Sequence, residues 1–436
     1  MRVQIGVVDS PAYKGKGIYL PVQELLYHVF IVGKTGAGKT VTLTNWMISL
    51  MRNLEEDPER APGFTFLDPH GDAVQDVLSR VPPKIEDRVH VLHFRETDWP
   101  RGFNLLDAPL ESLKEEAIGA FVQMLRDLFP GGTGPRMEHY LKNALLTLAK
   151  VPGQTVLSVL PLFGNDEFRE RIVGSVRDPV LREFWANQFQ GGPKALDVLG
   201  PILNKIGAFA AYPRVRRVVG QGKSTIDPLK IMNEGHILII DLAGAGEDVK
   251  PLMGAALINR YHFSALAREG TPREQRRPHC LLADEIHVYA TPAMADILSE
   301  DRKFGLGLVL ATQYLERIPK AVLEGILGNI GTKVVLPVSL ENATVLARDM
   351  APFTALDLAN LPLLHAAVKT RFQGRDMIFS MESPIPPRSD PSRAAEILYL
   401  SDQRDGRPVR DVDRAIEALF SELYQDVAAG KRLAGY

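Results

Sequence analysis

The stretch Val29–Thr40 reads VFIVGKTGAGKT and decides the fold of this chain. Its first part is a short, apolar and β-branched run, which is typical of a buried strand. Its second part, Gly33–Thr40, fits the pattern G-x-x-x-x-G-K-[ST] completely, and a helical repeat of apolar residues follows it. This order of strand, glycine-rich loop and helix predicts a phosphate-binding loop.

The residue types in this loop suit the binding of ATP with Mg²⁺. Glycines permit a tight turn whose backbone N–H groups converge on phosphate oxygens at the positive end of the next helix. Lys39 would reach the β- and γ-phosphates, and the hydroxyl of Thr40 would bind Mg²⁺. The predicted nucleotide-binding residues are Gly33, Lys34, Thr35, Gly36, Ala37, Gly38, Lys39 and Thr40.

Further short apolar runs recur along the chain, separated by helical patterns. Runs that are almost continuously apolar indicate strands buried on both faces, and therefore an α/β fold with a mostly parallel sheet covered by helices. The expected strands are Val29–Gly33, Gly63–Asp68, Val89–Phe94, His236–Leu242, Cys280–Glu285, Leu306–Gln313, Gly331–Val338 and His365–Phe372. A hairpin is expected to return from the last of these through a turn at Gly374–Asp376 into Met377–Glu382.

Helical spacing of apolar residues prevails between Phe94 and His236, where we expect no strand. We predict an all-α domain, residues 108–222, inserted into a nucleotide-binding domain formed by residues 1–107 and 223–390. Pro201 lies in one helical pattern, which predicts two short helices or one kinked helix. The stretch Gly131–Pro135 is expected to connect two helices. Residues 391–436 are expected to form a linker and an amphipathic helix, which packs on its own subunit or on a neighbour.

Candidate catalytic side chains follow two of the predicted strands. Asp284 and Glu285 end one strand, where the Asp can hold Mg²⁺ and the Glu can polarise an attacking water. Gln313 ends the next strand and could orient that water or respond to hydrolysis. This set favours hydrolysis of ATP over phosphoryl transfer to a small molecule. Asp68 is a candidate for the surroundings of the metal or for the start of a helix.

Arg302 precedes the strand that ends in Gln313. Ring ATPases stabilise the developing phosphate charge with an arginine from a neighbouring subunit, so Arg302 is a candidate for that role. The alternative interpretation is a solvated surface charge.

The composition limits how this protein could bind nucleic acid. The 436 residues include 51 Lys and Arg against 53 Asp and Glu, a formal net charge of −2. Such a balance argues against binding through net charge and leaves local patches or assembly into a ring. Two basic clusters are candidates, although such clusters are commonly solvated surface. They are Arg214, Arg216, Arg217 and Lys223, and then Arg273, Arg276 and Arg277.

The sequence also predicts the compartment. Its single cysteine, Cys280, excludes an intramolecular disulfide and a cysteine-based zinc cluster, and favours a reducing cytosol. No run approaches the roughly 20 apolar residues that a membrane helix needs. We therefore expect a cytoplasmic protein, which a membrane partner could recruit to the inner face of the membrane.

The order of the motifs is more specific than any one of them. GKTGAGKT (33–40), FLDPHGD (66–72), LLADE (281–285), DRKFGLGLVLATQ (301–313) and GNIGTKVVLPV (328–338) together resemble the HerA–FtsK superfamily of DNA-pumping ATPases. The most similar branch is the TraG/TraD-type coupling proteins of conjugation and their soluble relatives. The resemblance covers most of residues 20–385. It implies a RecA-like α/β domain in a hexameric ring, with ATP between subunits and DNA in the pore.

The resemblance also implies roles for single residues. Asp284 and Glu285 match the metal-binding and catalytic acids, Gln313 matches the sensor, and Arg302 matches the arginine that acts on the neighbouring site. Lys39 and Thr40 match the phosphate loop. Membrane-tethered coupling proteins have transmembrane helices before this loop, whereas here it begins at Gly33, which implies a soluble branch or recruitment by a membrane or relaxase-type partner.

The leading hypothesis is a hexameric, Mg²⁺- and ATP-dependent DNA translocase of conjugation-like DNA transfer, and the strandedness of the DNA stays open. Three alternatives remain. They are a secretion-type ring ATPase that acts on protein, a HerA-like helicase or translocase that processes DNA, and a recruitment module in which ATP only controls assembly.

Overall fold

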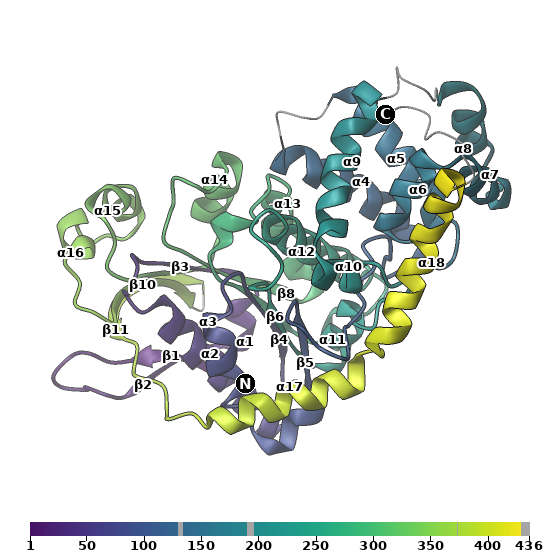
Figure 1. Ribbon diagram of the computed structural model, residues 1–436. Coiled ribbons are helices and arrows are strands. Elements are labelled where there is room, and N and C mark those ends of the chain that lie inside the picture. Colours follow the sequence, from purple (N-terminus) through teal and green to yellow (C-terminus); the bar gives the residue numbers. More distant parts are fainter. Residues whose placement is uncertain (130–133, 190–195, 373, 429–436) are drawn as a thin grey trace. The chain divides into compact units, whose positions relative to one another are not determined.

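The computed structural model describes residues 1–129, 134–189, 196–372 and 374–428 (Figure 1). Most of the expected connector Gly131–Pro135 therefore lies outside the described residues. The chain divides into two compact units. Unit 1 comprises Met1–Leu92, Leu229–Ala243 and Arg268–Ser401, and unit 2 comprises His93–Pro228, Gly244–Ala267 and the chain from Asp402 onward.

The described residues of unit 1 form a large mixed sheet that extends to His93. Its strands are β1 (Arg2–Val7), β2 (Gly17–Pro21), β3 (Val29–Val32), β4 (Gly63–Asp68), β5 (Val89–His93), β6 (Ile237–Asp241), β7 (His279–Ala283), β8 (Leu306–Thr312), β9 (Thr332–Val335), β10 (His365–Phe372) and β11 (Arg375–Glu382). The strand order is β2-β1-β11-β10-β9-β3-β8-β7-β4-β6-β5. Neighbours from β9 to β6 run parallel. The predicted α/β class with a mostly parallel sheet is confirmed.

The central strands are buried on both faces, which explains their almost continuous apolar sequences. Every residue of β3, β4, β7 and β8 is buried. Each strand therefore contributes alternate side chains to the layers on both sides of the sheet.

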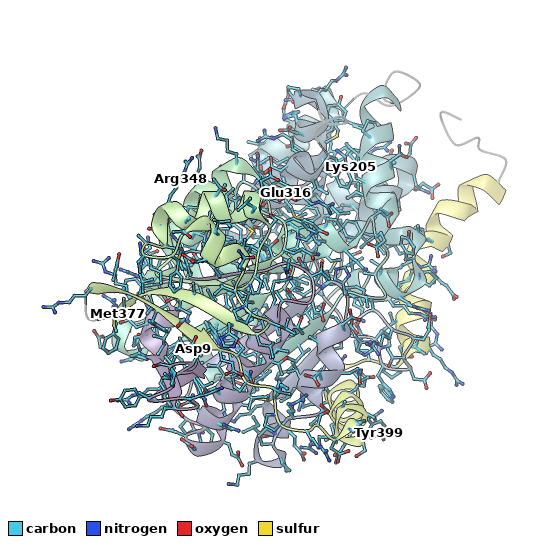
Figure 2. The ribbon with its side chains drawn as sticks, turned by 90° about the vertical axis from the view of Figure 1, so that its left-hand side faces the viewer. Asp9, Lys205, Glu316, Arg348, Met377 and Tyr399 are labelled. Carbon is cyan, nitrogen blue, oxygen red and sulfur yellow. The ribbon has the colours of Figure 1, made fainter. Side chains whose placement is uncertain are left out.

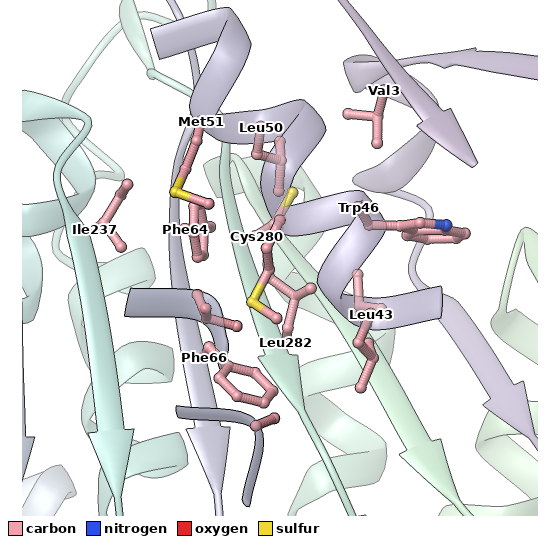
Figure 3. Packing of buried hydrophobic residues seen from close by; sticks show 14 of the residues in the cluster. Val3, Leu43, Trp46, Leu50, Met51, Phe64, Phe66, Ile237, Cys280 and Leu282 are labelled. Carbon is pink, nitrogen blue, oxygen red and sulfur yellow. The ribbon is translucent and has the colours of Figure 1, made fainter. Parts of the chain in front are cut away.

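Helix α2 (Lys39–Glu56) covers one of these faces. Its residues Leu43, Trp46 and Leu50 recur at helical spacing and belong to one buried cluster with Phe66 of β4 and Leu282 of β7 (Figure 3). Burying an apolar side chain of this size stabilises a fold by roughly 1.5–3 kcal/mol. This packing fixes the start of α2, and with it the end of the glycine-rich loop, against the sheet.

The N-terminal strands β1 and β2 were not predicted from the sequence. They pair antiparallel with a register shift between Gln4 and Gly6, although Val3, Ile5 and Val7 of β1 alternate with other residues, unlike the almost continuous apolar runs of the expected strands. β1 continues the sheet through one pairing, Val7 with Glu382 of β11. Two strands thus extend the sheet beyond the part that the sequence indicated.

The predicted hairpin is confirmed, since β10 and β11 pair antiparallel along their length. Arg375 and Asp376 belong to β11 rather than to the turn, which corrects the expected position of the turn. Gly374 has a φ of 78°, a left-handed conformation that glycine adopts without strain. Met377 is exposed at this hairpin (Figure 2). Ser380 of β11 donates a 2.9 Å hydrogen bond to Asp9.

The helices of unit 1 are, besides α2, α1 (Val22–Leu25), α3 (Asp72–Leu78), α13 (Met294–Glu300), α14 (Lys320–Asn329), α15 (Leu340–Leu346) and α16 (Ala355–Ala359). Those of unit 2 are α4 (Lys114–Leu128), α5 (Pro135–Ala149), α6 (Val159–Gly164), α7 (Asp166–Ser175), α8 (Pro179–Glu183), α9 (Leu196–Ala211), α10 (Pro213–Val219), α12 (Lys250–Leu266) and α18 (Val409–Ala428). Two helices, α11 (Pro228–Glu234) and α17 (Pro391–Asp405), cross the bounds of the units.

In unit 2, α4 packs on α12 and α5, and α9 packs on α5 and α6. Among the described residues no strand lies between β5 and β6, as predicted. Pro201 lies inside α9, which is a single helix. Unit 2 also takes in α12 and α18, and the bounds predicted for an inserted domain at 108–222 stay a prediction.

The C-terminal helix α18 packs on α6 and α10 of its own unit. Val412 and Ile416 are buried there, and Arg217 makes a two-pronged ion pair with Asp413 at 2.8 Å. The helix therefore covers its own chain over this stretch. Within the part of the chain that the structure describes, no helix is both long and apolar enough to cross a membrane.

Candidate active site

Several polar segments follow parallel strands and therefore meet at one edge of the sheet. The strand order places β8 between β3, which leads into the glycine-rich loop, and β7, which leads into Asp284 and Glu285. Val32 aligns with Thr312, the residue before Gln313. The carboxyl ends of these strands thus bring the loop, the paired acids and Gln313 to a common edge, the usual place of a ligand site in such sheets.

The backbone of the loop needs glycine at two positions. Gly36 and Gly38 have φ values of 75° and 108°, a left-handed region that costs other residues energy. A Cβ on Gly38 would also lie 2.6 Å from the side chain of Leu364. Lys34 and Thr35 are exposed on the loop, and Thr40 is exposed on the first turn of α2. The loop therefore presents its backbone and the Thr40 side chain to solvent.

Lys39 links the loop to the acids. Its side chain is buried, and its Nζ donates to the carbonyl oxygen of Gly33 at 3.0 Å. The same Nζ lies 3.6 Å from Oε1 of Glu285. Because an ammonium group carries three donors and no acceptor, this position holds the positive charge between the loop and a carboxylate.

Glu285 occupies a left-handed backbone conformation, with φ 46° and ψ 51°. Non-glycine residues hold such a conformation only where the surroundings impose it, and such residues cluster at functional sites. Burial opposes the ionisation of Glu285, but the hydrogen bond from His287 and the charge of Lys39 outweigh it and lower the pKa of its carboxyl. Glu285 is therefore a buried carboxylate that stays ionised.

His287 holds the far side of this carboxylate. Its Nδ1 lies 3.2 Å from Oε2 of Glu285 and 3.2 Å from the hydroxyl of Thr312. Its ring also packs edge-on against Tyr314, with 5.2 Å between ring centroids. Glu285 is thus fixed between a lysine and a histidine.

The neighbouring acid, Asp284, is in the opposite electrostatic situation. Burial raises its pKa to about 7, and the charges of Glu285 and Asp68 add to the effect. Asp68 itself accepts the backbone N–H groups of His70 at 2.9 Å and Ala73 at 3.0 Å, which supports its expected place at the start of a helix. The carboxylates at this edge therefore lack sufficient compensating positive charge.

Gln313 reaches the glycine-rich loop directly. Its Oε1 accepts a short hydrogen bond from the hydroxyl of Thr35, and its backbone oxygen lies 3.5 Å from Nδ2 of Asn342. The side chain predicted to respond to hydrolysis therefore contacts the segment predicted to hold phosphate.

Arg302 lies at the other edge of the sheet, in a 3-10 helix (Asp301–Phe304) that precedes β8. Its guanidinium carbon is 4.1 Å from the centroid of the Tyr27 ring. Since β8 has seven residues, each rising about 3.3 Å, Arg302 is about 20 Å from the loop of its own chain. The structure brings the other predicted residues together and leaves Arg302 apart.

Sequence reasoning missed His287 and Tyr289, whose hydroxyl donates to the backbone oxygen of Asp284. The only available signal for His287 was its place two residues after Glu285, in the same tight turn. The hydrogen bond of Tyr289 has no signal in the sequence, because it depends on the path of the backbone. Within the described residues, no cluster of three or more His, Cys, Asp or Glu side chains could hold a metal ion.

The predicted basic clusters are largely engaged within the chain. Arg214 and Arg217 pair with Glu96 at 2.9 and 3.1 Å, and Arg217 also pairs with Asp413. Arg276 and Arg277 donate to backbone carbonyl oxygens instead of acids. Ion pairs therefore neutralise Arg214 and Arg217, whereas backbone carbonyls hold the charges of Arg276 and Arg277 in place without neutralising them.

A glycine-rich loop between a parallel strand and a helix, with acids on a nearby strand end, defines the fold class of the P-loop NTPases. The chain is similar in structure to the bacterial conjugative coupling protein TrwBdeltaN70, with a TM-score of 0.61 and 18% identity over 90% of this chain and 92% of that one. TrwB in complex with ADP and Mg²⁺ gives 0.59 and 18% over 90% and 97%.

VirB4 of Thermoanaerobacter pseudethanolicus gives a TM-score of 0.58 and 14% identity over 88% of this chain and 96% of that one. These similarities establish a shared fold along most of the chain, and they confirm the predicted P-loop NTPase fold. No family model and no curated protein sequence matches the chain.

Proposed function

We propose that this chain hydrolyses ATP and uses the energy, as a hexameric ring, to move DNA in a conjugation-like transfer. The observation that carries the proposal is the contact of Lys39 on the loop with Glu285 on the neighbouring strand end, at 3.6 Å. A nucleotide-binding loop alone would serve binding, whereas an ionised glutamate beside its lysine suits the activation of water. The TrwB structures that share the fold include complexes with ADP and Mg²⁺ and with an ATP analogue.

The residues at this edge fit Mg²⁺. The raised pKa of Asp284 reflects burial beside Glu285 and Asp68, and a divalent cation would supply the missing positive charge. The exposed hydroxyl of Thr40 stands at the start of α2, and hard oxygen ligands of these kinds are the ones Mg²⁺ takes. When bound, the ion would neutralise charge on the phosphate oxygens.

The protein's own groups divide the remaining work. Lys39 would exchange the carbonyl of Gly33 for phosphate oxygens as nucleotide binds. Glu285 would accept a hydrogen bond from the attacking water, and Gln313, released from Thr35, would orient that water. Arg302 is too far from its own loop to take part there, so we assign it to the site of a neighbouring subunit.

DNA as the substrate rests on the motif order and on the shared fold with a conjugative coupling protein. A ring repeats each small basic patch around its axis, so weak patches become a collar for phosphates. We place this ring at the cytoplasmic face of a membrane, recruited by a membrane or relaxase-type partner.

One observation favours a second candidate, a ring ATPase that moves protein. Arg214 and Arg217, in one of the two predicted basic clusters, are neutralised by Glu96 and Asp413. This pairing reduces the charge that the cluster can offer to a DNA backbone.

One experiment separates these proposals. ATP hydrolysis is measured with single-stranded DNA, double-stranded DNA and no DNA, and particle mass is measured with a non-hydrolysable ATP analogue. We expect a hexamer whose hydrolysis DNA stimulates. Glu285→Gln, which keeps the shape and removes the charge, should bind the analogue without hydrolysis. Hydrolysis that DNA leaves unchanged would favour the second candidate, and a wild-type chain that binds ATP without hydrolysing it would contradict both.

A further inference from the structure

The connection between β9 and β10, residues 336–364, begins and ends on the glycine-rich loop. At its start, the backbone N–H of Lys34 donates a 2.8 Å hydrogen bond to the carbonyl oxygen of Pro337. Gly33 lies so close to the buried Leu336 that a Cβ on this glycine would be 2.8 Å from the Cβ of that leucine. The first residues of the loop are therefore fixed against the chain that leaves β9.

Leu364 contacts the other end of the loop. Its backbone N–H donates to the carbonyl oxygen of Ala37 at 3.4 Å. Its side chain occupies the space beside Gly38, where an added Cβ would meet it at 2.6 Å. Gly38 is the last residue before α2, so Leu364 stands next to the peptide groups that lead into Lys39. The connection between β9 and β10 thus holds the loop at both ends.

Leu364 has a backbone conformation that leucine rarely adopts. Its φ is 65°, in the left-handed region, where the Cβ of an ordinary residue crowds its own backbone. Such strain persists only where the surroundings impose it. Here the carbonyl oxygen of Leu364 accepts a 2.8 Å hydrogen bond from the N–H of Ser383, and the hydroxyl of Ser383 lies 2.8 Å from that of Thr42 on α2. The chain after β11 therefore ties Leu364 to the helix that follows the loop.

The choice of leucine at this position needs an explanation beyond the fold. Glycine or asparagine would adopt a left-handed conformation with less strain. What leucine adds is a branched apolar side chain against Gly38, a residue that has no side chain of its own and a φ of 108°. The position combines backbone strain with a contact to the loop, and strained residues of this kind cluster at functional sites.

We propose that Leu364 is a positioning residue, which keeps the glycine-rich loop in its nucleotide-binding conformation in the absence of ligand. A loop that adopts this conformation for only about a tenth of the time binds its ligand about tenfold more weakly. Leu364 therefore raises the affinity for nucleotide by acting through Gly38, and it does not itself bind the phosphates. The inference rests on the proposed function, in which this loop binds ATP.

The test uses the full chain and three variants. Leu364→Asn removes the apolar contact and introduces a residue that tolerates the left-handed conformation, whereas Leu364→Met keeps an apolar side chain of similar volume. Leu363→Asn is the matched control, because it makes the same change at a neighbouring leucine that is 66% exposed. The readouts are hydrogen exchange of the loop amides without nucleotide, affinity for ADP and for a non-hydrolysable ATP analogue, kcat and KM of hydrolysis, and the midpoint of urea denaturation.

We expect Leu364→Asn to speed the exchange of the loop amides and to weaken the binding of ADP and of the analogue alike, by about tenfold. KM for ATP should rise by a similar factor while kcat stays within about threefold, because an interaction that contributes equally to the ground state and the transition state affects KM alone. The urea midpoint should change little, since relief of backbone strain offsets the lost apolar contact. Leu364→Met and Leu363→Asn should both bind nucleotide within about threefold of wild type.

Two results would overturn the inference. One is a Leu364→Asn chain whose loop exchange and nucleotide affinity match those of the Leu363→Asn control. The other is a lower urea midpoint with an unchanged KM, which would assign Leu364 to the stability of the fold alone. A wild-type chain that binds ATP without hydrolysing it would contradict the proposed function, whereas the exchange and affinity measurements would still decide on Leu364.

Discussion

The two edges of the parallel sheet in unit 1 differ in the charge of their side chains and in how that charge is held. The carboxyl edge gathers acids, and the amino edge gathers arginines. At the carboxyl edge, burial raises the pKa of Asp284 to about 7, and the charges of Glu285 and Asp68 add to the effect. At the amino edge, Arg268 and Arg276 are bound by backbone carbonyls that carry no net charge. Carboxylates thus gather around Lys39 at one edge, whereas at the other edge Arg268 and Arg276 make no ion pair within the described residues. The comparison shows that burial controls the charge of Asp284 at the carboxyl edge, whereas uncharged hydrogen-bond acceptors hold the arginines at the amino edge.

The largest effects are expected from replacing Lys39 at the carboxyl edge and Arg302 at the amino edge, and they should differ in nucleotide binding. Lys39→Ala should lower hydrolysis by roughly 10²–10³-fold and also weaken nucleotide binding, because the loop loses its charged donor. Arg302→Ala should lower hydrolysis comparably while nucleotide binding stays near normal. Equilibrium binding of a fluorescent ATP analogue, run beside the hydrolysis assay, distinguishes the two. Equal losses of binding in both variants would place both residues at one site and remove the distinction.

At the amino edge, the stability of the fold should depend on the hydrogen bonds of Arg268. Arg268→Ala leaves the carbonyl oxygens of Phe304 and Arg277 without their buried donor, so we expect the free energy of unfolding to fall by about 3 kcal/mol. Arg273→Ala, at an exposed position, should change it by less than about 0.5 kcal/mol. Urea denaturation of both variants measures this. If Arg268→Ala lowered the free energy of unfolding only slightly, the stability of the turn Asp301–Phe304 and of the loop before β7 would not depend on these hydrogen bonds.

Lowering the pH should weaken ligand binding at the carboxyl edge, which depends on Asp284, before it affects the arginines at the amino edge. Asp284 must lose its proton to bind Mg²⁺, so below a pKa of about 7 Mg²⁺-dependent nucleotide binding should weaken by about tenfold per pH unit. In the absence of Mg²⁺ and nucleotide, pH affects the stability of the fold with the opposite sign. The folded state binds this proton more tightly than the unfolded state, so between about pH 4 and 7 the stability falls as pH rises.

Calorimetric titrations from pH 5.5 to 8 measure the slope. Asp284→Asn is the control, since it removes the titrating group and should flatten both dependences. A slope that persists in Asp284→Asn would assign the proton to another group.

The smallest effect concerns the fixing of Glu285. His287 helps lower the pKa of Glu285, so His287→Ala should move the acidic limb of the rate profile to higher pH. The loss of rate at pH 8 should be less than the roughly 10²-fold that loss of a general base costs, because Lys39 still pairs with the carboxylate. A pH–rate profile of both chains decides. An unchanged acidic limb would show that His287 only fills space.

The sequence predicted the carboxyl edge far better than the amino edge, for physical reasons. Glycines at fixed spacing, a buried strand and acids at a strand end each leave a local pattern, so the loop, Asp284, Glu285 and Gln313 were found as candidates. Contacts between residues far apart in the sequence left no such local pattern. The contacts of His287 with Thr312 and of Arg268 with Phe304 join residues far apart in the chain.

The same limit applies to the surface and to the sheet. Arg217 looked like a candidate for DNA contact, but its acid partners, Glu96 and Asp413, lie far from it in sequence. The expected strands rest on almost continuous apolar runs, which β1 lacks because Val3, Ile5 and Val7 alternate with other residues. Local chemistry can be predicted from one sequence, whereas pairings between distant residues need the fold.

Strand β8 fixes a length. Gln313 directly follows its last residue, Arg302 lies in the turn Asp301–Phe304 just before it, and hydrogen bonds to β3 and β7 fix its register on both sides. A strand held in this way cannot stretch, so its seven residues set the distance between its two ends at about 20 Å. In the proposed ring, the length of β8 would therefore determine the spacing of successive subunits. Inserting or deleting a residue in β8 would change that spacing at every interface at once.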